Sequence, residues 1–146
     1  MATITVTDEQ LRLIQDALDM YSRIGIGQFW VIKDHPTFQD ILHEKCKVQE
    51  NVDYSLYHSL RDSADKYLSL GRDTLIADST LGQHGSFGIY NEKVDESCRV
   101  AYDLIQVIRH EFWKANPNRS EHVVMSSVHL SSKDSDKIKV DLKNYD

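Results

Sequence analysis

Two long segments of the chain carry apolar residues at the spacing of one helix face, and this pattern constrains the fold most. The first segment steps by three or four residues from Leu11 to Gln28, and the second steps in the same way from Val94 to Phe112. Such steps follow one side of an α-helix, because the helix has about 3.6 residues per turn. The chain is therefore expected to form two long helices, each with one face in a core.

Residues at the ends of these segments bound the two helices. Thr7 and Gln10 have the spacing of a capping box, which opens the first helix. This helix is expected to run to about Lys33 and to end before Pro36, because a proline disfavours the α conformation of the residue before it. Asp95 is expected to cap the second helix.

The remaining elements are predicted to be shorter. They are a strand at residues 3–6, a helix from Thr37 to about Val48, a weaker helix over residues 52–71 that stops at Gly71, and a C-terminal β-hairpin from residues 122–130 and 137–142. The apolar contacts of the two shorter helices are expected to be Phe38, Ile41 and Leu42, and Leu56, Leu60, Ala64 and Tyr67. Residues 71–91 hold four of the six glycines and are expected to form a strand–turn–strand unit or a long ordered loop. The order predicts an α+β single domain over residues 1–146, with two long helices plus shorter ones packed on a small antiparallel sheet.

Composition narrows the class of protein. Of the 146 residues 40% are hydrophobic and 27% are charged, and the formal net charge is −6, which favours a globular, acidic protein. A nucleic-acid polymer is not an expected partner, because surfaces that bind it are normally basic. The sequence shows no membrane span and no secretory signal. Cys46 and Cys98 lack CxxC spacing and are expected to be reduced thiols in a cytosolic protein.

Two glycines interrupt the first predicted helix. Gly25 and Gly27 each destabilise a helix by roughly 1 kcal/mol relative to alanine, so a compensating contact is expected. They favour either close packing of helices or subunits, or a ligand site beside the glycines with Arg23 and Gln28 as its polar groups.

A glycine-rich turn precedes the second long helix. The segment from Gly85 to Asn91 has backbone N–H groups that can bind phosphate oxygens, and Phe87 and Tyr90 are rings on which a base can stack. It matches neither a P-loop nor a dinucleotide-binding motif. A purely structural turn is the alternative.

The hydrophilic side of the second long helix carries the remaining candidates. Arg99, Asp103, Gln106 and His110 are spaced as one polar stripe, and Arg109 lies at its border. A guanidinium binds phosphate with two hydrogen bonds, so Arg99 and Arg109 are candidate phosphate contacts. The alternative for Arg109 is a structural pair with a carboxylate.

No enzyme signature is present in the sequence. The seven histidines form neither an HExxH nor an HxH pair, and no GxSxG elbow occurs. A metal site assembled from His84, His110 and His122 is a minor alternative. The sequence therefore favours binding over catalysis, with no catalytic residue, cofactor or metal expected.

Two segments together resemble small proteins encoded by bacteriophages. They are ALDMYSRIGIGQF (residues 17–29) and SFGIYNEKVDESCRVAYDLIQVIRHEFW (residues 86–113), about 40 of the 146 residues. They are most similar to the Thoeris anti-defence sponge family. The resemblance implies a non-catalytic protein that sequesters cyclic ADP-ribose isomers made by bacterial TIR-domain proteins, so that the NADase effector stays off. It also implies a homo-oligomer with signal pockets at protomer interfaces and, as in some members, a separate site for cyclic oligonucleotides.

The residues and the resemblance together predict a nucleotide-sequestering protein of the host cytoplasm. The expected ligand contacts are Phe87, Tyr90, Asn91, Arg99, Arg109, Arg23 and Gln28. Two alternatives remain: a hydrolase or phosphodiesterase of the same ligands that uses the histidines, and an inhibitor that binds a host protein.

Overall fold

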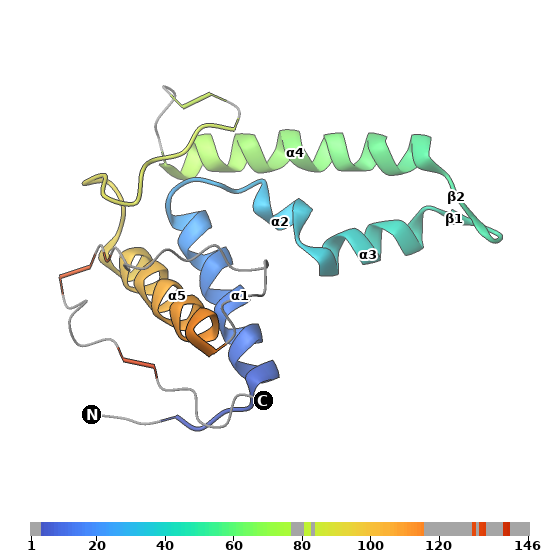
Figure 1. The fold of residues 1–146 in the computed structure, drawn as a ribbon. Coiled ribbons are helices and arrows are strands. Elements are labelled where there is room, and N and C mark those ends of the chain that lie inside the picture. Colours follow the sequence, from blue (N-terminus) through green and yellow to red (C-terminus); the bar gives the residue numbers. More distant parts are fainter. Residues whose placement is uncertain are drawn as a thin grey trace. The chain divides into compact units, whose positions relative to one another are not determined.

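A computed structural model describes residues 4–76, 81–82, 84–115, 130, 132–133 and 139–140. These residues form five helices and one two-stranded antiparallel sheet, so the predicted α+β class is confirmed (Figure 1). The elements are α1 (Asp8–Gly25), α2 (Val31–Asp34), α3 (Pro36–Lys45), β1 (Lys47–Val48), β2 (Asn51–Val52), α4 (Tyr54–Ile76) and α5 (Glu96–Ala115). None of the helices in these ranges is long and apolar enough to cross a membrane.

The contacts group the chain into two compact units. Unit 1 takes residues 1–25 and 87–146 and contains α1 and α5, and unit 2 takes residues 26–86 and contains α2, α3, α4 and the sheet. The expectation of a single domain stays a prediction.

Unit 1 is built on the packing of α1 against α5. The capping box that opens α1 is confirmed, since the Thr7 amide donates to Gln10 Oε1 at 2.9 Å and the Gln10 amide donates to Thr7 Oγ1 at 3.2 Å. Asp95 caps α5 as predicted, by accepting the Ser97 amide at 2.8 Å. The apolar residues predicted along α5 are all buried: Val94, Cys98, Ala101, Ile105, Ile108 and Phe112.

Gly25 brings the two helices of unit 1 close together. A Cβ atom at this position would lie 2.0 Å from Cys98 Sγ, so only glycine fits without displacing α5. Burial raises the pKa of the Cys98 thiol, which keeps the thiol in its neutral form. The sequence left open close packing at Gly25 or a ligand site beside it. The structure shows close packing of two helices of the same chain at Gly25.

Replacing Gly25 with alanine is expected to destabilise the protein by about 1–3 kcal/mol, because the new methyl group overlaps the Cys98 side chain. Gly71→Ala is the matched control, since nothing lies within 4 Å of a Cβ added there, and it is expected to be neutral or stabilising. Urea unfolding of both variants measures the difference. Equal unfolding midpoints would contradict the assigned role of Gly25.

One polar residue of α5 is buried against the C-terminal part of the chain. Asp103 has no exposed surface, and its Oδ2 accepts both the amide and the hydroxyl of Ser132, at 2.7 and 2.5 Å. The Lys133 amide also donates to Glu96 Oε1 at 2.7 Å. Asp103, expected on the hydrophilic side of this helix, is therefore buried, and Ser132 supplies the hydrogen bonds that replace water.

Unit 2 is a helical hairpin preceded by the short helix α2. Helices α3 and α4 run back past each other and are joined by the sheet, in which Lys47 pairs with Val52 and Val48 with Asn51 (Figure 1). His35 caps α3, its Nδ1 accepting the Thr37 amide at 3.3 Å.

Several predicted boundaries differ from the structure. The first helix ends at Gly25 rather than near Lys33, because Gly27 has φ +90°, a left-handed conformation that breaks the helix. Helix α4 continues through Gly71 to Ile76, since a glycine stops a helix only where the chain turns left-handed.

The predicted strands also differ. Residues 4–6 of the strand predicted at 3–6 form no strand with any described residue, and no strand occurs in the described part of residues 71–91. The sheet instead follows α3, which ends at Lys45. The predicted C-terminal hairpin lies mainly outside the described residues.

Candidate functional site

The turn before α5 presents one exposed aromatic ring. The Asn91 amide donates to Gly88 O at 2.9 Å and the Val94 amide donates to Asn91 O at 3.0 Å. The Asn91 side chain accepts the Lys93 amide at 3.0 Å. These bonds fix two successive turns, and Tyr90 projects from them with 64% of its surface exposed.

Arg99 holds this turn against α5. Its Nη2 donates to Asn91 O at 2.8 Å and to Val94 O at 3.2 Å, and its Nη1 lies 3.9 Å from a carboxylate oxygen of Glu96. The guanidinium thus stabilises the turn that carries Tyr90. Its expected contact with phosphate stays a prediction.

Phe87 and Tyr90 have different surroundings. Phe87 is only 8% exposed, and Lys93 Nζ lies 5.3 Å from the centre of its ring. A cation over an aromatic face is attracted by the ring electrons. Phe87 therefore belongs to the core of unit 1, and Tyr90 is the ring of this turn that is open to a stacking ligand.

A stripe along α5 continues from the turn. Arg99, Tyr102, Gln106 and Arg109 are three or four residues apart and so share one helix face. Burial raises the pKa of Tyr102, the neighbouring phenol of Tyr90 adds to the rise, and Arg109 opposes it. The two phenols and the Arg109 guanidinium are therefore electrostatic neighbours.

Arg109 is positioned by a carboxylate of α1. Its Nη2 lies 3.2 Å from Asp19 Oδ1, and Asp19 Oδ2 accepts Arg23 Nε at 2.5 Å. The side chains are partly exposed, at 28% for Arg109, 28% for Asp19 and 44% for Arg23. The three groups together carry one net positive charge. We call the set formed by Tyr90, Tyr102, Gln106, Arg109 and Arg23 the Tyr–Arg face.

Gln28 is not part of this face. It belongs to unit 2, where its amide donates to Ser86 Oγ at 3.2 Å. Its expected ligand contact stays a prediction.

Unit 2 contains a buried carboxylate with two basic partners. Asp65 is 9% exposed, and its oxygens lie 3.3 Å from Lys33 Nζ and 3.0 Å from His84 Nε2. The rings of His84 and Trp30 pack in a T-shaped arrangement with their centroids 5.4 Å apart. Asp65 therefore orients a histidine whose side chain is 56% exposed.

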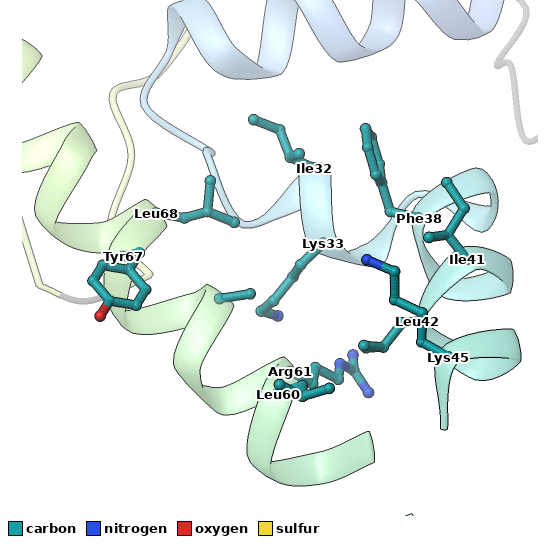
Figure 2. Close-up of a pocket in the computed structure, with 11 residues that line it drawn as sticks. Ile32, Lys33, Phe38, Ile41, Leu42, Lys45, Leu60, Arg61, Tyr67 and Leu68 are labelled. Atoms are coloured by element: carbon teal, nitrogen blue, oxygen red, sulfur yellow. The ribbon is translucent and has the colours of Figure 1, made fainter. Parts of the chain in front are cut away.

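A groove of about 400 Å³ lies between α2, α3 and α4, all within unit 2 (Figure 2). Its lining is mostly aliphatic and aromatic and includes three cations, Lys33, Lys45 and Arg61. The other lining residues are Ile32, Phe38, Ile41, Leu42, Leu60, Ala64, Tyr67 and Leu68. Apolar contacts predicted for α3 and α4 line it, yet Phe38, Ile41 and Tyr67 are 46%, 48% and 76% exposed. The sequence identified these residues, but the expectation that they would be covered is wrong.

The histidines considered for a metal site lie in different parts of the chain. His84 belongs to unit 2, His110 stacks on Trp113 in unit 1 at a ring distance of 5.6 Å, and His122 lies outside the described residues. Within the described ranges, no three His, Cys, Asp or Glu side chains are placed to hold a metal ion.

Sequence reasoning missed Tyr102 and Asp19. Tyr102 was detectable, because it lies three residues after Arg99 and seven before Arg109, on the same helix face. Asp19 had no such signal, since it is 90 residues from Arg109 and meets it only through the packing of α1 on α5.

No protein-family description, curated protein or solved structure matches this chain.

Proposed function

We propose that the protein binds a cyclic, phosphate-containing signalling nucleotide of the cyclic ADP-ribose class and sequesters it without turnover. The observation that carries the proposal is the Tyr–Arg face of unit 1. There an exposed ring on a fixed turn neighbours a half-buried phenol and an arginine that a carboxylate holds in place.

Each part of the face suits one part of such a ligand. Tyr90 offers its ring for stacking on the base, which contributes about 1–3 kcal/mol. Gln106 and the phenol of Tyr102 offer hydrogen bonds to ribose hydroxyls. Arg109 and Arg23 offer charged N–H donors to the phosphates, at about 1.5–3 kcal/mol per bond.

The chemistry of these groups favours binding over proton transfer. A general acid or base works best when its pKa is near the working pH. Burial raises the pKa of Tyr102 further above neutrality, and a guanidinium stays protonated at any physiological pH. The face can therefore hold an anionic ligand but has no group tuned to cleave it.

The proposal includes the cellular setting that the phage resemblance implies. The protein acts in the host cytoplasm, as a homo-oligomer, by lowering the free concentration of an immune signal. Sequestration at micromolar signal levels needs a dissociation constant of about 1 μM or lower, which is roughly −8 kcal/mol.

Incubation with cyclic ADP-ribose isomers, followed by heat denaturation and mass spectrometry, tests both parts of the proposal. We expect calorimetry to show binding and the ligand to be recovered intact, with or without chelator. Intact recovery without measurable binding contradicts sequestration, and a new product contradicts the absence of turnover. Cyclic di- and trinucleotides in the same titrations test for a separate site.

A hydrolase is the second candidate, because Asp65 orients an exposed histidine in unit 2. A carboxylate bonded to a histidine is an arrangement that general bases use. If a product forms, His84→Ala should abolish it while Arg109→Ala only weakens binding. Product formation that survives His84→Ala would exclude this assignment.

A further inference from the structure

Helix α4 exposes a regular apolar stripe along most of its length. From Leu56 to Thr74 the stripe steps by 4, 3, 4, 3 and 4 residues, which is the spacing of the a and d positions of a coiled coil. The exposed fractions are 42% for Leu56, 40% for Leu60, 76% for Tyr67 and 64% for Leu70. We call the six residues the α4 seam: Leu56, Leu60, Ser63, Tyr67, Leu70 and Thr74.

The two hydroxyl residues of the α4 seam are compatible with an apolar contact. Ser63 Oγ donates to Ser59 O at 2.8 Å, and Thr74 Oγ1 donates to Leu70 O at 2.9 Å. Each hydroxyl thus has a hydrogen-bond acceptor inside its own helix, so covering it does not leave the donor unsatisfied. The whole seam can be buried by another helix.

We propose that the α4 seam is the surface through which a second copy of this chain binds, with the two α4 helices antiparallel. With the two-fold axis at the level of residue 65, Leu60 faces Leu70 of the second copy, Leu56 faces Thr74, and the small Ser63 faces the large Tyr67. The stripe is therefore complementary to itself in this direction. A parallel pair would place Tyr67 against Tyr67 and Ser63 against Ser63, which packs less well.

Charged side chains also lie beside the α4 seam. Asp62 and Lys66 lie on one flank of the seam, and neither makes an ion pair with any described residue. In the antiparallel pair, Lys66 of one copy lies about 3 Å along the helix axis from both Asp62 and Lys66 of the other, from the rise of about 1.5 Å per residue. Asp62 can therefore offset the repulsion between the two Lys66 side chains.

The groove of unit 2 enlarges this surface. The α4 seam spans about 27 Å, fewer than three heptads, which is short for a stable two-helix coiled coil. Leu60 and Tyr67 also border the groove, and across it α3 exposes Phe38 and Ile41 (Figure 2). Two α3–α4 hairpins joined in this way form a four-helix arrangement in which α3 adds apolar area from both copies.

Light scattering and sedimentation of the full chain over a dilution series test the proposal. We expect a dimer or a larger assembly that Leu60→Asp with Leu70→Asp dissociates, raising the dissociation constant at least about a hundredfold, because each contact then buries an unpaired charge. Leu75→Asp is the matched control, since Leu75 is 76% exposed on the same helix but lies off the seam. The mass of the assembly formed by this variant should equal that of the wild type. A monomeric wild type, or an assembly that the double variant does not dissociate, overturns the proposal.

A charge exchange tests the antiparallel register. Asp62→Lys and Lys66→Asp are each expected to raise the dissociation constant about two- to tenfold, as exposed ion pairs do, and the double exchange is expected to restore it. Failure of the double exchange to restore assembly contradicts this register. Ligand binding by unit 1 is measured separately by calorimetry, so a failure of the proposed ligand binding can be told apart from a failure of the proposed interface.

Discussion

Replacing Arg109 with alanine is expected to weaken binding of a cyclic ADP-ribose isomer about ten- to a hundredfold. The guanidinium is partly exposed beside Tyr102 and is held by Asp19, so its donors are oriented before a phosphate arrives. A charge-assisted hydrogen bond of this kind is worth about 1.5–3 kcal/mol. Isothermal titration calorimetry measures the change. The affinity of Arg109→Lys should lie between those of the wild type and Arg109→Ala, because lysine keeps the charge but cannot form the two parallel hydrogen bonds of a guanidinium.

Lys114→Ala is the matched control for Arg109→Ala. Lys114 is also a cation of α5, it pairs with Glu111, and half of its side chain is exposed. The control removes the same formal charge but lies off the Tyr–Arg face, so affinity should change less than twofold. If Arg109→Ala lowers stability and leaves affinity unchanged, Arg109 serves only to pair with Asp19.

Replacing Arg72 with methionine is expected to destabilise unit 2 by about 1–3 kcal/mol, because the hydrogen bonds of the buried guanidinium are lost. The Arg72 side chain is 2% exposed and pairs with Asp73. Its Nη1 donates to Gly82 O at 2.8 Å and to Gly85 O at 3.1 Å. Methionine fills much of the volume but leaves these carbonyl groups without their donor.

Arg61→Met is the matched control for Arg72→Met. Arg61 also pairs with a carboxylate, Asp34, but its side chain is 36% exposed, so its loss should cost less than about 1 kcal/mol. Urea unfolding followed by circular dichroism compares the two variants. Similar unfolding midpoints would show that the bonds of Arg72 to residues 82 and 85 do not stabilise the unit.

The placement of the Tyr–Arg face links the fold to the proposed function. Ligand binding needs groups that are fixed before the ligand arrives, since ordering them afterwards reduces affinity. Arg99 fixes the turn that carries Tyr90, and Asp19 fixes Arg109. The proposed self-association uses unit 2, so the two properties can be measured separately.

Helix positions were predictable from the sequence because their determinants are local. The capping box at Thr7 and Gln10, the cap at Asp95 and the buried face of α5 each depend on residues within a few turns of one another. Helix ends were less predictable. Gly27 and Gly71 are the same residue type, yet one breaks a helix and the other lies inside α4, because the path of the surrounding chain sets the backbone conformation.

The sequence alone identified Tyr90, Arg109 and Arg23 of the Tyr–Arg face and the helix that carries most of the face, since spacing along α5 is a local property. It could not identify the partners that give those residues their roles. Asp19 meets Arg109 from 90 residues away, His84 meets Asp65 from 19 residues away, and Asp103 is buried where Ser132 bonds to it. Pairs of this kind depend on how helices and distant segments pack, because a charge or hydrogen bond acts through distance in space and not through separation along the chain.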